Sequence, residues 1–373
     1  MSSRYPTFAA DILTLFEARD VALTHVDILQ PADPFLDMAG EDLRRRIYLT
    51  ENETGQSLCL RPEFTIPVCL DHISKRASTP RRYGYLGEVF RQRREGGTEF
   101  FQAGIEDLGS ADRPEADARS LADAHALLTA VLPTEPLTVT VGDQAIFEAV
   151  LSALGLPRGL QKRLLRAFGS PERLDATINE FRTPRTSQPL PPEIAALVQK
   201  DDEAELVAHV ESQMVAMGHS TSAGRHPQEI ARRLREKRQL DSLTLSEGAL
   251  NALRNFLALR VEIGTAVDTL AAFAKDSGIA IDQALDEFEK RNNATVKSGV
   301  PLDNIHYDAG FGRPLDYYTG FIFEIGSDRL SQPLVGGGRY DRLLTLLGAK
   351  ETIPGVGFSV WLDRVESLRE ARS

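Results

Sequence analysis

The spacing of hydrophobic residues predicts a helix at the start of the chain and a strand soon after it. Apolar residues recur at helical spacing over residues 8–19, and the apolar stretch 26–29 has the length of a short strand. Pro31 and Pro34 interrupt the pattern that follows. We therefore expect a helix, a strand and a proline-broken connection.

Short apolar and aromatic runs separated by turn residues continue this β pattern. They cover residues 58–68, 83–90 and 100–108. Gly96 and Gly97 lie between the last two runs, which predicts that these two strands form an antiparallel pair.

A well-marked helix follows these strands. Asp112 and Pro114 together form a helix start, and apolar residues continue on one face until Pro133. The alternating stretch 137–141 then predicts another strand.

From about residue 155 to residue 300 the sequence becomes charged and helix-periodic, interrupted by a proline-rich linker at 182–192. The β pattern then returns at residues 321–325, 333–335 and 355–360. A sheet interrupted in sequence by helices is an α+β pattern. We expect one discontinuous domain, 1–154 with 301–373, and an inserted helical domain, 155–300.

Composition narrows the class of protein. The 373 residues are 42% hydrophobic and 26% charged, as in ordinary globular proteins, and the net charge of −11 argues against an extended nucleic-acid surface. The chain has no signal-peptide run or stretch long enough to span a membrane, so we expect a cytoplasmic protein. The spacing of Cys59 and Cys69 predicts buried thiols without a disulfide or a metal.

Four segments combine arginine, acidic and aromatic residues beyond what a β core requires. They are residues 60–65 (Leu-Arg-Pro-Glu-Phe-Thr), 90–93 leading to 102–106, 313–320 (Arg-Pro-Leu-Asp-Tyr-Tyr-Thr-Gly), and 336–341 (Gly-Gly-Gly-Arg-Tyr-Asp) with 362–364. Each segment alone is explained by packing or a turn. Their joint occurrence in this order is more specific.

In this order the segments resemble the catalytic domain of histidyl-tRNA synthetase, whose signatures run LRPEGT, FRHE, HQFGVE, RGLDYY, GGGRYD and GLER. The resemblance covers nearly the whole chain outside the helical insertion. It implies a class II synthetase fold, with an antiparallel sheet of six or seven strands flanked by helices. It also implies a homodimer formed through the early strand and helix near Pro31.

The resemblance also implies a histidine pocket. Carried over by position, its residues are Glu63, Thr65, Gln102, Glu106, Arg313, Tyr317 and Tyr318. Carboxylate, amide and hydroxyl groups suit an ammonium and the two nitrogens of an imidazole, and an arginine suits a carboxylate. The candidate remnants of a phosphate or nucleotide site are Arg91, Arg364 and Arg339.

Three departures from the synthetase pattern argue against tRNA charging. Nine residues follow Arg364, so we expect neither an anticodon-binding domain nor a tRNA partner. Arg93 stands where the family has the glutamate that recognises adenine, and Pro314 and Phe64 replace glycines. The retained pocket combined with these losses is similar to the regulatory subunit of ATP phosphoribosyltransferase.

This second resemblance implies a non-catalytic subunit that joins a short catalytic subunit, in a hetero-oligomer such as a hetero-octamer, for the first step of histidine biosynthesis. Histidine would act as an allosteric ligand, without a cofactor or a metal. The main alternative is a truncated synthetase-like enzyme that forms histidyl-adenylate. A third interpretation is a scaffold with a vestigial pocket.

Overall fold

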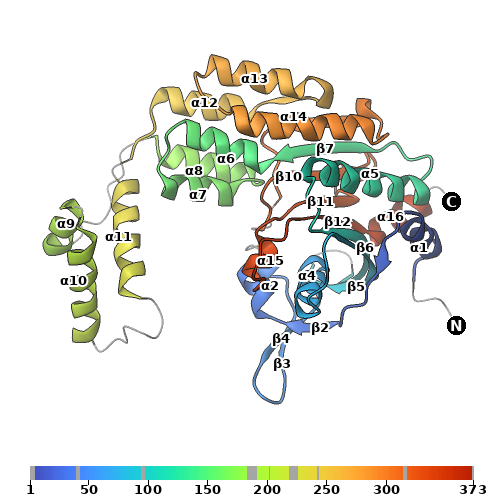
Figure 1. The fold of residues 1–373 in the computed structure, drawn as a ribbon, viewed down its shortest axis with the longest axis horizontal. Coiled ribbons are helices and arrows are strands. Elements are labelled where there is room, and N and C mark those ends of the chain that lie inside the picture. The colour runs from blue at the N-terminus through green and yellow to red at the C-terminus, as the bar shows by residue number, and fades with distance from the viewer. Residues whose placement is uncertain are drawn as a thin grey trace. The chain divides into compact units, whose positions relative to one another are not determined.

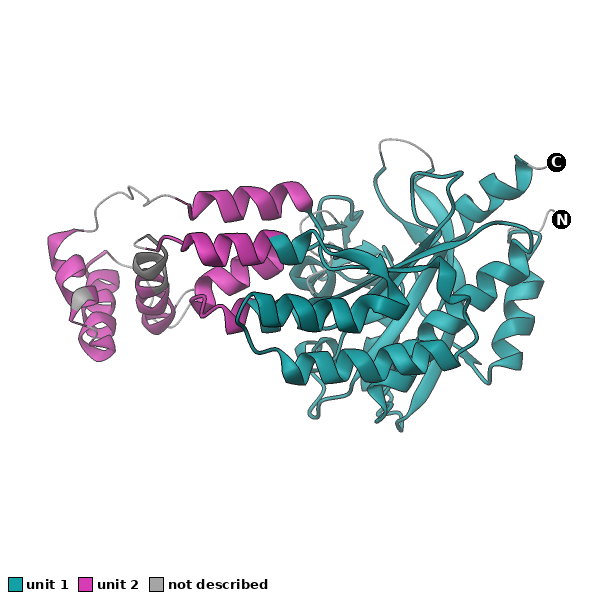
Figure 2. Cartoon of the chain, turned by 90° about the horizontal axis from the view of Figure 1, so that it is seen from above, with its two compact units in different colours: residues 1–150, 168–170, 255–373 teal, residues 151–167, 171–254 magenta. Residues whose placement is uncertain are grey.

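The computed structural model describes residues 5–38, 43–93, 97–182, 191–200, 202–217, 226–241, 243–313 and 317–371. The chain forms two compact units, coloured separately in Figure 2. Unit 1 contains residues 1–150, 168–170 and 255–373, and unit 2 contains residues 151–167 and 171–254. Within the described ranges, no helix is both long and apolar enough to cross a membrane.

The described part of unit 1 is built on a nine-stranded sheet with the order β1-β5-β6-β12-β11-β10-β7-β9-β8 (Figure 1). In that order the strands span Ala22–Leu23, Arg81–Phe90, Glu99–Leu108, Gly355–Trp361, Val335–Arg339, Phe321–Gly326, Thr138–Asp143, Ile305–Asp308 and Arg260–Glu262. In the sheet order β5-β6-β12-β11-β10-β7, each strand pairs antiparallel with the next, which confirms the implied fold. The parallel pairs β1–β5 and β7–β9 extend the sheet beyond the expected six or seven antiparallel strands.

The strands β5 and β6 form the antiparallel pair predicted from the sequence, and their alternation gives the sheet two distinct faces. Asp107 of β6 points toward helix α5 (Arg113–Val131), where Arg119 binds it at 2.6 Å. The preceding residue, Glu106, lies on the other face, 2.7 Å from the hydroxyl of Thr65. Successive residues of a strand point to opposite faces, so one strand contributes side chains both to the α5 layer and to the opposite face.

Helix α5 covers one of these faces together with α14 (Asp282–Lys297). It begins as predicted, because the Asp112 side chain accepts a hydrogen bond from the backbone N–H of Glu115 at 3.1 Å. Its predicted apolar face is buried and consists of Leu121, Ala124, Leu128 and Val131. Burial of this face against the sheet stabilises the long helix.

The remaining helices of unit 1 surround the sheet. They are α1 (Ala9–Ala18), α2 (Asp33–Met38), α4 (Thr65–Ser74), α13 (Ala266–Asp276), α15 (Leu343–Leu346) and α16 (Leu362–Glu370). A second, three-stranded sheet has the order β2-β4-β3, with strands Leu29–Pro31, Ser57–Leu60 and Leu49–Glu51. Both cysteines are buried, as predicted.

The apolar run 58–68 is a strand only at its start, so the β pattern does not extend over the whole run. Strand β4 ends at Leu60, and α4 begins at Thr65. The change follows from Glu63, whose carboxylate accepts the N–H groups of Thr65 and Ile66 and so caps the new helix. An apolar pattern of this length does not distinguish the two states.

Unit 2 is helical in its described residues, in agreement with the expected helical insertion. Its helices α7 to α11 span Arg158–Ala167, Pro171–Glu180, Pro192–Gln199, Glu203–Ala216 and Pro227–Asp241. Helices α6 (Gln144–Ala153) and α12 (Glu247–Leu257) cross the boundary between the units. A small core of Leu206, Val210 and Ala231 holds α10 and α11 together.

The observed boundaries differ from the expected insertion at 155–300, because residues 255–300 belong to unit 1. Strand β8 pairs with β9, and α14 packs on α5. The sequence of α14 is rich in charged residues, so the sequence pattern did not reveal that one face of this helix is buried. Packing against α5 decides the boundary.

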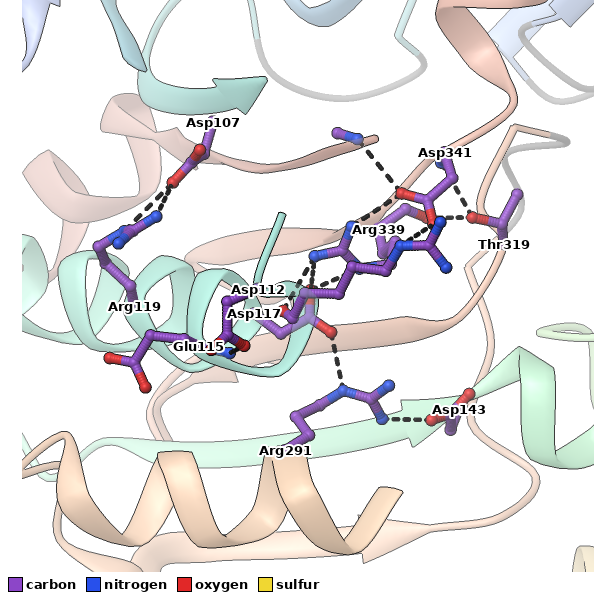
Figure 3. Close-up of polar contacts among 12 residues, drawn as sticks. Asp107, Asp112, Glu115, Asp117, Arg119, Asp143, Arg291, Thr319, Arg339 and Asp341 are labelled. Atoms are coloured by element: carbon purple, nitrogen blue, oxygen red, sulfur yellow. Dashed lines mark hydrogen bonds and ion pairs between the residues drawn. The ribbon is translucent and has the colours of Figure 1, made fainter. Parts of the chain in front are cut away.

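A chain of buried charges joins α5, α14 and the sheet (Figure 3). Asp117 is fully buried and binds Arg291 at 2.8 Å and Arg339 at 2.6 Å. Arg291 also binds Asp143 of β7, and Arg339 binds Asp341 at 2.7 Å. Burial by itself lowers the pKa of Arg291, but the two carboxylates raise it by more, so the arginine stays charged.

Replacing Asp117 with asparagine should lower the free energy of unfolding by about 3 kcal/mol or more, because two buried guanidinium groups lose their shared carboxylate. Urea unfolding followed by circular dichroism measures the change. The matched control is Asp286→Asn, which breaks an exposed pair with Lys290 and should change stability little. Equal losses in the two variants would contradict a central role for Asp117.

Candidate functional site

A cavity of about 360 Å³ lies on the face of the sheet opposite α5, within unit 1. Strands β6, β11 and β12 contribute Gln102, Gly336 and Ser359 to its wall. These residues alternate with neighbours that point toward α5. The cavity size is at the lower end of the range for small-molecule pockets and suits a ligand as small as one amino acid.

The cavity brings together most of the residues that the sequence predicted. Six of the seven histidine-pocket candidates line it, namely Glu63, Thr65, Gln102, Arg313, Tyr317 and Tyr318. Arg91 and Arg364 line it as well. The structure thus gathers side chains from five separate sequence segments around one space.

Arg339 lies elsewhere, which corrects its assignment as part of a phosphate site. Gly336 and Gly338 of the same strand face the cavity side. A Cβ on Gly336 would lie 2.1 Å from Arg313 Nη1, and a Cβ on Gly338 would lie 2.9 Å from the ring of Tyr318. The side chain of Arg339 points to the other face and binds Asp117. The alternation of the strand separates this arginine from the cavity.

Glu106 lies beneath the cavity wall and supports two of its hydroxyl groups. Its carboxyl oxygens contact the hydroxyls of Thr65, at 2.7 Å, and Tyr340. Gly357 of the neighbouring strand leaves the space, because a Cβ there would lie 1.8 Å from Glu106 Oε2. Burial raises the pKa of Glu106 to about 8, although the hydroxyl of Thr65 opposes the shift, so the group keeps its proton at neutral pH.

Glu63 combines a structural and a site role. Its two oxygens accept the backbone N–H groups of Thr65 at 2.7 Å and Ile66 at 2.9 Å. Burial raises its pKa, while these N–H groups and the charge of Arg91 lower it. A carboxylate accepts more than one hydrogen bond per oxygen, so Glu63 retains acceptor capacity toward the cavity.

Gln102 provides the clearest sign that the cavity is built for a polar ligand. The side chain is fully buried and lines the cavity, yet neither its amide nitrogen nor its carbonyl oxygen has a hydrogen-bond partner among the described residues. A buried polar group without a partner costs about 1–3 kcal/mol. A ligand that offers both a donor and an acceptor would remove this cost.

Arg313 lies flat against the sheet at the side of the cavity. Its guanidinium binds Glu324, and a Cβ on Gly336 would lie 2.1 Å from its Nη1 atom, so only glycine fits beneath it. Its Nε–H is buried and unpaired among the described residues. The neighbouring Pro314, which replaces the glycine of the synthetase signature, lies outside the described residues.

Two further arginines line the cavity. Arg91 donates from Nε to the carbonyl of Pro62 at 2.6 Å, and Arg364 lies 4.4 Å from the centre of the Trp361 ring. Burial lowers the pKa of both Arg91 and Arg364 to about 10. Both remain cationic at neutral pH, so the part of the wall that they form favours an anionic group.

Sequence reasoning missed several lining residues. Tyr340 stood inside a segment that was singled out, but its hydroxyl was not assigned a role. Trp361, the single tryptophan of the chain, directly precedes the segment that contains Arg364. The sequence does not single out Glu324 or Arg46, because only the folded structure brings these residues to the cavity.

Comparison with known proteins identifies the family. A family model described as histidyl-tRNA synthetase matches residues 3–244 and 226–365. The chain is 67% identical over 369 residues to an ATP phosphoribosyltransferase regulatory subunit of Chelativorans sp. (strain BNC1), and 99% of each chain is covered. The chain belongs to the ATP phosphoribosyltransferase regulatory subunit family. A second member of this family, from Mesorhizobium japonicum, is 62% identical over the full length of both chains.

Solved structures agree on the fold of the family. An ATP phosphoribosyltransferase regulatory subunit/histidyl-tRNA synthetase from Bacillus halodurans C superposes with a TM-score of 0.64, at 20% identity, covering 98% of this chain and 80% of that one. A histidyl-tRNA synthetase from Nostoc sp. PCC 7120 gives the same TM-score at 17% identity, covering 98% of this chain and 71% of that one. These likenesses confirm the class II synthetase-like fold.

The buried Glu106 predicts a pH dependence of stability. The unfolded state releases this proton near pH 4.5, whereas the folded state holds it to about pH 8, so the free energy of unfolding falls as pH rises across this window. Glu106→Gln removes the titration. Its stability relative to the parent chain should therefore increase from about pH 5 to pH 8.

Urea unfolding at several pH values measures this difference. Glu53→Gln, at an exposed position, is the control and should follow the parent chain. Parallel pH profiles for the parent chain and Glu106→Gln would show that the buried carboxyl does not hold the proton.

Proposed function

We propose that this chain is the non-catalytic regulatory subunit of an ATP phosphoribosyltransferase. In this role it joins a short catalytic subunit in the first step of histidine biosynthesis and raises its activity. Histidine bound in the cavity lowers that activity. Family membership supports the partner, and the unpaired amide of Gln102 supports a polar ligand of amino-acid size.

The side chains around the cavity match the groups of free histidine. Glu63 and the hydroxyl of Thr65 are acceptors for an ammonium group. Arg313 suits the carboxylate of histidine. Gln102 and the hydroxyl of Tyr317 supply partners for the imidazole ring, which both donates and accepts hydrogen bonds. Glu106 acts through Thr65 and therefore supports the pocket from below.

Regulation requires that histidine bind more tightly to the inhibited state of the complex than to its active state. A coupling of about 1–3 kcal/mol is typical and corresponds to a 5- to 150-fold difference in affinity. A subunit that senses histidine must bind it without consuming it. Arg93 replaces the glutamate with which the synthetases recognise adenine, while the residues of the pocket are retained. This combination fits the requirement.

A homodimer is the expected core of the complex. The small sheet of β2, β3 and β4 lies near Pro31, where the synthetase resemblance places the dimer contact. Ile28, Leu29 and Leu49 in and beside this sheet are exposed large apolar residues. Burial of these side chains by a second copy would remove them from water.

The second candidate function is histidyl-adenylate formation. The presence of Arg91, Arg313 and Arg364 around one cavity favours it, because these arginines suit a carboxylate and phosphates. An ATP/pyrophosphate exchange assay with histidine separates the two functions. Exchange by the chain alone would establish the enzyme in place of the regulator.

The decisive test of the regulatory role uses the short catalytic subunit from the same organism. Phosphoribosyl-ATP formation is measured with and without this chain, across a histidine titration. We expect the chain to raise the rate and histidine to lower it only when the chain is present. A rate that is indifferent to the chain would refute the proposal.

Replacing Gln102 with methionine keeps most of the side-chain volume and removes both polar atoms. We expect histidine binding, measured by isothermal titration calorimetry, to weaken by about 10- to 100-fold, because a ring nitrogen left without its partner in the cavity costs about 1–3 kcal/mol. Gln283→Met, at an exposed position of α14, is the control and should bind as the parent chain does. Unchanged affinity in Gln102→Met would exclude Gln102 from the ligand contacts.

A further inference from the structure

Ser359 lies in the middle of a row of positions that crosses the sheet on its cavity side. It is directly opposite Gly336 of β11 in one direction and Gly104 of β6 in the other. Residues that are directly opposite in an antiparallel sheet point to the same face, and both Gly336 and Ser359 line the cavity. The two glycines carry no side chain, so the space above each of them is open to a side chain from elsewhere.

Arg313 and Tyr85 fill the space above the two glycines. A Cβ on Gly336 would lie 2.1 Å from Nη1 of Arg313, and a Cβ on Gly104 would lie 2.3 Å from the hydroxyl oxygen of Tyr85. Ser359 therefore has a guanidinium group on one side and a phenol hydroxyl on the other. The guanidinium group suits the carboxylate of a ligand, whereas the phenol contacts Ser359 itself.

The hydroxyl of Tyr85 fixes the direction of the hydrogen bond that Ser359 makes with it. Tyr85 donates to the carbonyl oxygen of Phe358 at 3.0 Å, and its hydroxyl oxygen lies 2.6 Å from Oγ of Ser359. A phenol has a single proton, so a Tyr85 that donates to the carbonyl accepts the proton of Ser359. Burial raises the pKa of Tyr85 well above its usual value, so the phenol keeps its own proton. The lone pairs left on Oγ make Ser359 an acceptor toward the cavity.

We propose that Ser359 is a specificity-determining residue whose oxygen accepts a hydrogen bond from the ammonium group of a bound amino acid. The assignment rests on the proposed function, in which this amino acid is histidine. An ammonium group has three N–H donors, and Glu63 and the Thr65 hydroxyl supply two acceptors. Ser359 supplies the third. The ammonium group is attached to the carbon next to the carboxylate, so a ligand held by Arg313 places it beside β12, the strand that carries Ser359.

Three probes separate the groups of the ligand. Histidine carries both the ammonium and the carboxylate, histidinol lacks the carboxylate, and imidazolepropionate lacks the ammonium. Ser359→Ala should bind histidine and histidinol about tenfold more weakly than the parent chain, which is the effect of losing a hydrogen bond to a charged group. Its affinity for imidazolepropionate should equal that of the parent chain, because this probe has no ammonium group.

Calorimetry on the full chain measures the affinities, and circular dichroism checks the fold. Tyr85→Phe removes the group to which Ser359 donates, and this variant should also weaken histidine binding. Because Tyr85 acts through Ser359, the double variant should bind histidine no more weakly than Ser359→Ala alone. Ser152→Ala, at an exposed position of α6, is the control and should leave every affinity unchanged.

Equal losses for histidine and imidazolepropionate in Ser359→Ala, or no loss for either, would overturn the proposal. A loss for these two probes but not for histidinol would assign Ser359 to the carboxylate and would also overturn it. If the parent chain binds another amino acid but not histidine, the proposed function is refuted, and that amino acid with its analogue lacking the amine tests Ser359 in the same way. Binding of no amino acid would refute both proposals.

Discussion

The alternation of side chains across the central antiparallel strands is the constraint on which the rest of this structure depends. In β6, Gln102 and Glu106 face the cavity while Asp107 faces α5. In β11, Gly336 and Arg339 divide in the same way. Because the period is two, a shift of one residue in register would exchange the faces and destroy both the cavity and the helix layer. The many backbone pairs of these strands therefore fix the site as much as the fold.

The two faces solve the problem of buried polarity in different ways. On the α5 face, Asp117 is fully paired with Arg291 and Arg339, so the charges are satisfied by the protein itself. On the cavity face, Gln102 and the Nε–H groups of Arg313 and Arg364 have no such partners among the described residues. Unsatisfied groups lower stability, and they persist where a ligand completes them. The Asp117 network and the Gln102 amide thus represent two different outcomes for a buried polar group in this sheet.

Much of this organisation could be predicted from sequence where it depends on local pattern. The β5–β6 pair, the start of α5 at Asp112 and the helical character of unit 2 all follow from spacing and capping. The structure brings most of the candidate residues named from the ordered motifs to one cavity. Features that depend on contacts between segments far apart in the sequence could not be predicted from the local pattern. Residues 255–300 pack with the sheet through α14, and the side chain of Arg339 follows the phase of a strand whose register is set by β10 and β12.

The loop that carries Tyr317 and Tyr318 gives the cavity a physical connection to the buried charges. The next residue, Thr319, donates its N–H to the carbonyl of Arg339 at 2.8 Å and accepts the N–H of Asp341 at 3.0 Å. The tyrosines are thus attached to a strand that is held by Asp117 on the opposite face. A contact with these tyrosines is therefore also linked, through Thr319 and β11, to the α5 face. The Asp117 network therefore ties the tyrosine loop to α5 and α14 as well as to the sheet.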